Sequence, residues 1–245
     1  MVEEGCTMAG YDPGPLIRQL EALSDKDYAA LNQTLSPTTK GRFIGVRVPR
    51  QRAIAKKLAA SEDWRDFLEA SRDADIFELK MLHAMVLGYA KCDIGERLTY
   101  IDAFLPHIDD WAQCDTLCST LKPAAKDREA AYRHALGCAR SDEEFRKRYG
   151  LVLLMSRFHD APCIDGTMQV YRDFHHNGYY ARMGAAWGLA TLWLHARGAC
   201  LEILKENLWD PFTHNKAIQK LCESYRISDE DKALARSLRR KKENP

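Results

Sequence analysis

Apolar residues recur at helical spacing along almost the whole chain. In the segment 16–23, for example, Leu16, Leu20 and Leu23 fall on one side of a helix. The same spacing predicts helices over 28–35, 49–60, 62–71, 74–91, 95–106, 109–121, 127–139, 142–159, 166–176, 179–197, 199–207, 213–225 and 229–241. No run of alternating polar and apolar residues is long enough to form a convincing strand. We therefore expect an all-α protein.

Short links join most of these helices, as at residues 122–123 and 141–142. Short links between amphipathic helices imply antiparallel neighbours, which leaves a bundle or a solenoid of helix pairs. We expect one helical-repeat domain over 13–241, after a disordered start at 1–12 and before a C-terminal tail at 242–245.

Three residues with functional side chains support the solenoid over the bundle. Trp111, Arg148 and Trp187 recur at close to the ~40-residue period of HEAT-type helix pairs. Equivalent positions in successive pairs line one face of a solenoid, normally the concave one. The spacing therefore predicts a concave groove that carries these side chains.

Composition and charge change this picture little. Lys and Arg number 36 against 35 for Asp and Glu, so net charge indicates neither nucleic acid nor a membrane, and only local clustering could. The chain starts without a signal-peptide pattern and lacks the ~18 consecutive apolar residues of a membrane helix. We expect a cytoplasmic protein that contacts no membrane.

The cysteines and the search for familiar catalytic motifs indicate no metal, nucleotide or serine-hydrolase site. Eight cysteines are dispersed without a Cys-x-x-Cys pair, which is typical of reduced thiols. Cys114 and Cys118 could share a helix face, but nothing supplies the remaining ligands of a zinc site, so packing is favoured. Glycine-rich nucleotide loops, His-Glu-x-x-His and Gly-x-Ser-x-Gly are absent. We expect neither a metal nor a cofactor.

Trp111 and Asp115 lie four residues apart, so in a helix an aromatic ring and a carboxylate would point the same way. On its own, such a pair is usually a core ring beside a solvated charge. Arg148 borders an apolar run, where it could equally be a residue at the edge of a face with its stem along the core.

Basic residues cluster in three other places. Arg42, Arg47, Arg50 and Arg52 flank the long connection 36–48 and the helix start after it. Free backbone N–H groups there would add to phosphate attraction, although a solvated helix start explains the cluster equally well. Lys216 and Lys220 follow another helix start and could also grip phosphate. The basic run 239–242 is better explained as a frayed, solvated terminus.

Five short segments resemble, in the same order, the AlkD-like DNA alkylation repair family. They are 43–52 (FIGVRVPRQR), 111–115 (WAQCD), 148–154 (RYGLVLL), 184–187 (GAAW) and 213–220 (THNKAIQK). The resemblance covers essentially residues 15–240. It implies an all-helical solenoid of HEAT-like repeats with a basic concave groove for double-stranded DNA. It also implies a monofunctional glycosylase that acts on positively charged N3- and N7-alkylated purines.

The resemblance also implies roles for single residues. Trp111 and Trp187 match two cleft tryptophans, Asp115 the catalytic carboxylate, Arg148 a cleft arginine and Tyr28 a tyrosine near the groove. Arg47, Arg50, Lys216 and Lys220 are then the candidate DNA-binding cations. We expect a monomer. The alternative is a non-catalytic helical-repeat protein that binds branched or damaged DNA, or a protein partner.

Overall fold

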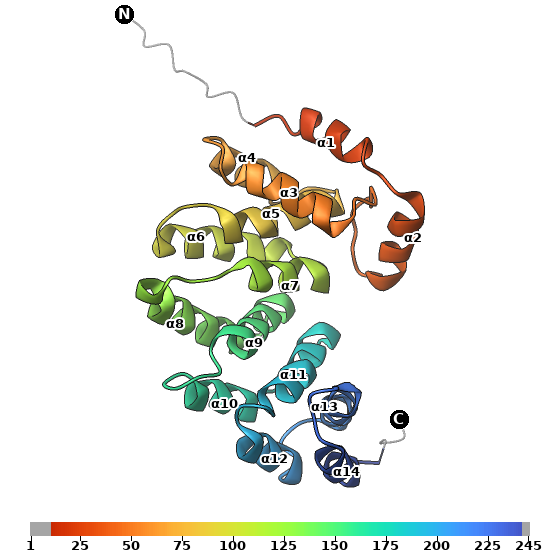
Figure 1. Ribbon diagram of the computed structural model, residues 1–245, viewed down its shortest axis with the longest axis vertical. Helices are drawn as coiled ribbons and strands as arrows, with labels where there is room; N and C mark the ends of the chain where they lie inside the picture. Colours follow the sequence, from red (N-terminus) through yellow and green to blue (C-terminus); the bar gives the residue numbers. More distant parts are fainter. Residues whose placement is uncertain (1–10, 242–245) are drawn as a thin grey trace, which may run out of the picture. The chain divides into compact units, whose positions relative to one another are not determined.

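The computed structural model describes residues 11–241, and these residues form helices and loops without a β-strand (Figure 1). The all-α prediction is therefore confirmed, and the arrangement is consistent with a helical-repeat solenoid. The expected disordered start at 1–12, except for its last two residues, and the tail at 242–245 lie outside the described residues. No helix among residues 11–241 is both long and apolar enough to cross a membrane.

Backbone contacts divide the chain into two compact units, between Leu121 and Lys122. The N-terminal unit holds α1 (Gly14–Glu21), α2 (Lys26–Leu35), α3 (Val48–Leu58), α4 (Trp64–Ser71), α5 (Phe77–Tyr89), α6 (Ile94–Phe104), the 3-10 turn Leu105–His107 and α7 (Trp111–Thr120). The C-terminal unit holds the 3-10 turn Ala125–Asp127, α8 (Arg128–Ala139), α9 (Glu144–Arg157), α10 (Ile164–Arg172), α11 (Tyr179–Leu192), α12 (Arg197–Lys205), α13 (Pro211–Glu223) and α14 (Asp229–Ser237).

Helix α5 is the core of the N-terminal unit. Its residues are buried without a break from Phe77 to Leu87, because the segment is apolar on almost every side. It packs against both α3 and α7, and Figure 1 shows these three helices in succession. Through this row the central core fixes the helix that carries Trp111.

In the C-terminal unit, α9 and α11 take the same central place. Helix α9 packs against α8 and α11, and α11 in turn packs against α13. Gly150 permits the close approach of α8 and α9, because a Cβ there would lie 2.3 Å from the Ala139 nitrogen. The helices that carry Arg148 and Trp187 are thus in direct contact.

The long connection between α2 and α3 is anchored by a buried carboxylate. Glu78 accepts hydrogen bonds from the backbone N–H groups of Ile44 (2.9 Å), Gly45 (2.7 Å) and Val46 (3.3 Å). Gly45 has a φ of 92°, and a Cβ there would come within 2.2 Å of the Asp25 carbonyl oxygen. The loop is consequently fixed in one path, which ends at Arg47 and the start of α3.

Candidate functional site

The first half of the candidate site lies at the start of α7. Asp110 caps this helix, because its carboxylate accepts a 2.7 Å hydrogen bond from the N–H of Ala112. The cap makes Trp111 the first helical residue and places Asp115 one turn later on the same face. Cys114 and Leu117 are buried in the core, whereas Trp111 and Asp115 are only half-buried. The indole and the carboxylate therefore lie at the edge of the core, where solvent reaches them in part.

The indole of Trp111 is oriented by a contact from α2. Its Nε1–H donates a 3.1 Å hydrogen bond to the carbonyl of Leu35, the last residue of α2. Close by, the hydroxyl of Thr38 donates to the carbonyl of Asp109 at 2.9 Å. These two bonds join the end of α2 to the start of α7, which restricts how the indole can turn.

Tyr28 and Arg47 form a second cluster in the same unit. The Arg47 guanidinium lies 5.0 Å from the centre of the Tyr28 ring, and its Nη2 is 2.7 Å from Asp25 Oδ2. Hydrogen bonds from the Tyr28 N–H and from Arg47 lower the pKa of the Asp25 carboxyl. Asp25 thus offsets part of the Arg47 charge. Arg50, exposed on the first turn of α3, has no acidic side chain beside it in that turn.

Arg148 and Trp187 belong to α9 and α11 of the C-terminal unit. Arg148 is only 5% exposed, and its Nη1 donates a 2.8 Å hydrogen bond to the carbonyl of Tyr180. Its stem runs over Gly184, whose missing side chain makes the room: a Cβ there would lie 3.4 Å from Arg148 Cγ. Arg148 is therefore held against α11. The alternative that Arg148 lies at the edge of an exposed face, with its stem along the core and its head in water, is wrong because the whole side chain is buried.

Trp187 lies on α11, one turn beyond the glycine that accommodates Arg148. Its side chain is 39% exposed, whereas the neighbouring positions Ala185, Ala186 and Leu189 are buried. The indole is therefore the part of this helix stretch that a ligand can reach. The structure thus brings Arg148 and Trp187 to adjacent helices within one unit.

The two candidate lysines of α13 both have polar partners. Lys216 Nζ donates to Gln219 Oε1 at 3.1 Å, and Lys220 Nζ lies 3.0 Å from Glu223 Oε2. Hydrogen bonds from Lys220 and Gln219 lower the pKa of the Glu223 carboxyl. Lys220 is therefore partly neutralised by an acidic neighbour, and Lys216 is the less compensated of the two cations.

Arg240, in the C-terminal basic run, is docked against α13, so the interpretation as a frayed terminus is wrong for this residue. The backbone N–H of Arg240 donates to Asn215 Oδ1 at 3.0 Å, and its carbonyl accepts from Asn215 Nδ2 at 2.9 Å. A cleft of about 790 Å³ lies beside this contact. Lys242, the last residue of the basic run, lies outside the described residues.

Two residues that matter to these clusters were not singled out from the sequence. Leu35 acts through its backbone carbonyl, so no side-chain pattern could reveal its contact with Trp111. Glu78 did leave a signal, because it is a charged residue inside a mostly apolar helix and a buried charge needs partners.

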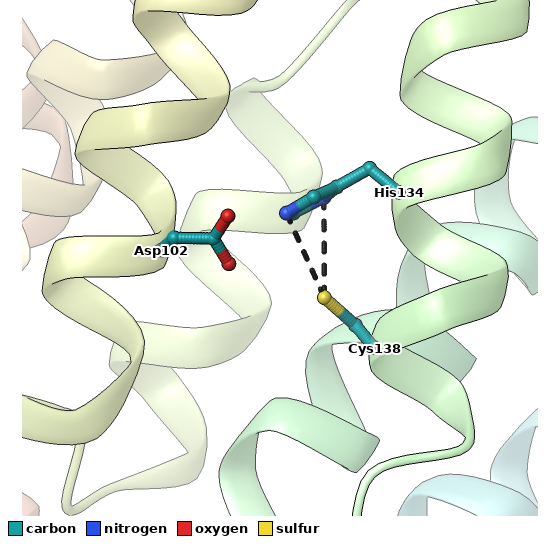
Figure 2. A group of neighbouring side chains, drawn as sticks. All are labelled: Asp102, His134 and Cys138. Carbon is teal, nitrogen blue, oxygen red and sulfur yellow. Dashed lines mark hydrogen bonds between the residues drawn. The ribbon is translucent and has the colours of Figure 1, made fainter.

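Helix α8 carries a cysteine and a histidine one turn apart. Figure 2 shows Cys138 and His134, whose Sγ and Nε2 atoms lie 3.7 Å apart. The hydroxyl of Tyr149 lies 3.4 Å from His134 Nδ1. Cys138 and His134 alone would supply only two ligands, fewer than the three or four of a protein zinc site. Within the C-terminal unit this cluster is a polar packing contact between α8 and α9.

The cysteines that the structure describes are not in disulfides. Seven cysteines among residues 11–241 carry reduced thiols, and Cys114 and Cys118 are buried in the core on α7. Burial raises the pKa of the Cys200 thiol to about 12. This thiol is consequently protonated and unreactive at neutral pH.

Comparison with known proteins gives one match. The family described as DNA alkylation repair enzyme matches residues 16–232, which include Tyr28, Trp111, Asp115, Arg148 and Trp187. No curated protein and no solved structure matches the chain. Because the family match covers well over half of the chain, and agrees with the resemblance of the five short segments, the protein belongs to the AlkD-like family of DNA alkylation repair enzymes.

Proposed function

We propose that the protein is a monofunctional DNA glycosylase, which hydrolyses the N-glycosidic bond of positively charged N3- and N7-alkylated purines in duplex DNA. The observation that carries the proposal is the pair Trp111 and Asp115, fixed on one half-buried face at the capped start of α7. The pair lies in a chain whose family repairs alkylated DNA.

The chemistry needs few protein groups. An alkylated purine with a positively charged ring leaves with the bonding electrons of the glycosidic bond and becomes neutral, so a general acid is unnecessary. The sugar develops oxocarbenium character. Asp115 stabilises this cation electrostatically and orients a water molecule, which adds to C1′ and gives up a proton. The products are the free alkylated base and an abasic site.

The other candidate residues hold the substrate. The indole faces of Trp111 and Trp187 pack on the sugar and backbone and attract the developing cation, each by about 1–2 kcal/mol where water is excluded. Arg148, held in place by its hydrogen bond to the Tyr180 carbonyl, binds a nearby phosphate of the substrate. Arg47, Arg50, Lys216 and Lys220 contact the DNA backbone, with Tyr28 beside Arg47.

The decisive experiment replaces the carboxylate without changing its shape. Purified protein should release 7-methylguanine or 3-methyladenine from methylated duplex DNA. Asp115→Asn should slow this release by about 100- to 1000-fold, because it removes the charge that stabilises the sugar cation. Asp66→Asn, the same change in the first turn of α4, should leave the rate within about twofold. Circular dichroism and thermal unfolding of both variants would verify the fold.

The alternative, a non-catalytic binding protein, gives a different result. It predicts that the wild-type chain binds duplex or branched DNA but releases no base even when enzyme is in excess over substrate. That outcome would overturn the glycosylase proposal. Binding that does not weaken as salt is raised would further indicate a protein partner in place of DNA.

A further inference from the structure

A concave basic surface lies at the end of the chain, apart from the four residues proposed for catalysis. We call it the α13 cleft. Its volume is about 790 Å³, and it is lined by Asp210, Pro211, Phe212, Asn215, Lys216, Gln219, Arg239 and Arg240. Every one of these residues belongs to the C-terminal unit.

The charge of the α13 cleft is positive. Lys216, Arg239 and Arg240 contribute three cations, and within residues 11–241 none of the three forms an ion pair. The carboxylate in the lining is Asp210, and it is already engaged. It accepts from the N–H groups of Phe212 (3.0 Å) and Thr213 (3.1 Å) as the cap of α13, and Arg182 lies 3.7 Å away. An anion that enters the cleft therefore meets more positive than negative charge.

The cationic wall is held in place before any ligand binds. Asn215 exchanges two hydrogen bonds with the backbone of Arg240, and Arg240 Nη1 donates to the carbonyl of Trp209 at 2.7 Å. His214 Nε2 lies 2.8 Å from the carbonyl of Leu238. These contacts fix the backbone of the segment 238–240 against α13, so binding of an anion to Arg239 would order little more than one side chain.

The lining of the cleft also has an apolar part. Phe212 and Pro211 form it, and the Phe212 ring is flanked by the Arg182 guanidinium at 4.4 Å and by the Lys216 ammonium at 5.9 Å. Cations beside an aromatic ring fit a ligand that carries both a negative group and an apolar surface. A nucleic-acid backbone repeats that combination, with a phosphate next to each sugar.

We propose that the α13 cleft binds a phosphodiester of the DNA backbone, with Lys216 and Arg239 on the phosphate and Phe212 against the neighbouring deoxyribose. The site extends the DNA contact to the segment 238–240, which directly follows α14. This inference rests on the proposed function, because it identifies a further part of the DNA surface that the enzyme holds.

The test measures binding to undamaged duplex DNA by fluorescence anisotropy over a series of salt concentrations. Arg239→Ala and Lys216→Ala should each raise Kd by about 5- to 10-fold and reduce the slope of log K against log salt by about one. The matched control is Arg236→Ala. It removes the same charge from the exposed last turn of α14, outside the cleft, and should change Kd by less than about twofold.

Three results would overturn the proposal. They are an unchanged Kd for both cleft variants, an equal loss of affinity in Arg236→Ala, and a loss of affinity with no change in salt slope. Titration with inorganic phosphate distinguishes the source of the anion. Phosphate binding that Arg239→Ala abolishes, with duplex binding intact, would assign the cleft to a free anion and overturn its assignment to DNA.

This test is independent of base release. The duplex carries no lesion, so the cleft can be shown to bind DNA even if the protein proves not to be a glycosylase. Conversely, release that depends on Asp115, together with unchanged binding by the cleft variants, would support the proposed function and overturn the assignment of the cleft.

Discussion

His83 is a fully buried imidazole in the core of the N-terminal unit. Its ring stacks on Phe104 with the two centroids 4.0 Å apart, and its Nδ1 lies 2.9 Å from the Ser71 hydroxyl oxygen. Burial, followed by repulsion from Arg72 and His107, lowers its pKa well below the ordinary value of 6.5. The folded unit therefore holds this ring neutral in a pH range where an unfolded chain would protonate it.

This pKa difference makes the stability of the N-terminal unit depend on pH. Below pH 6.5 the unfolded state binds a proton that the folded state does not, so stability is lost as pH falls, by up to about 1.4 kcal/mol per pH unit. Above pH 6.5 both states are neutral and the effect of His83 vanishes. Urea unfolding between pH 7.5 and 5.5 should show this slope, and His83→Gln should flatten it.

An NMR titration of the folded protein provides the control, since it does not depend on the stability of a variant. The His83 ring resonances should still be those of the neutral form at pH 6.5, where an unshifted imidazole is half protonated. Titration of this ring with a midpoint near 6.5 would contradict the argument.

Some residue positions could be predicted from the sequence and others could not. Trp111 and Asp115 could be positioned on one face from their spacing, because the spacing of two residues in one helix is a local feature. The burial of Arg148 depends on Tyr180, 32 positions away, and the docking of Arg240 depends on Asn215, 25 positions away. Helical periodicity carries no information about contacts at such separations.

The loop before α3 requires a glycine at position 45. Gly45→Ala should destabilise the protein by about 1–3 kcal/mol, because the loop needs a positive φ and the new Cβ would clash with the Asp25 carbonyl. Gly137→Ala should instead stabilise it by about 0.5–1 kcal/mol, since Gly137 is inside α8 and nothing lies within 4 Å of its Cβ position. Thermal unfolding of the pair should give opposite shifts in Tm, and shifts of the same sign would refute this account.

For the helices, the sequence predicted which segments are helical better than it predicted where each helix ends. Proline and capping residues are local signals, so each predicted helix has a counterpart within a few residues. The predicted helices 166–176 and 179–197 run four and five residues past the ends of α10 and α11, and 229–241 runs four residues past α14, which ends at Ser237. The chain beyond it turns back onto α13 through Leu238 and Arg240, which is a tertiary contact and leaves no trace in the periodic pattern.

Over the whole molecule, a net charge of +1 conceals a strong separation of charge between elements. Helix α3 carries Arg50, Arg52, Lys56 and Lys57 and no acidic residue, whereas the first turn of α14 is acidic at Asp229, Glu230 and Asp231. Local charge of this kind attracts a polyanion although the total is close to zero. Composition could not reveal this, because it sums over elements with opposite charge.

We therefore expect DNA binding to depend steeply on salt. With the six phosphate contacts proposed above, affinity for undamaged duplex should fall by about 1000-fold between 50 and 200 mM salt, because each contact releases condensed counterions. Anisotropy titrations at fixed pH would measure the slope. A slope near zero would show that the basic helices do not contact the phosphate backbone.

Helix α2 buries none of its residues, and both Leu31 and Leu35 are 53% exposed. Its ends are attached through the bonds of Asp25 and through the carbonyl that receives the Trp111 indole. The free energy of local opening there is accordingly the sum of a few polar contacts, whereas opening α5 would expose the core. Amide hydrogens of α5 should therefore exchange slowly with solvent, whereas those of α2, which contacts Trp111, should exchange rapidly. The indole orientation can fluctuate while the helix that carries Asp115 stays folded.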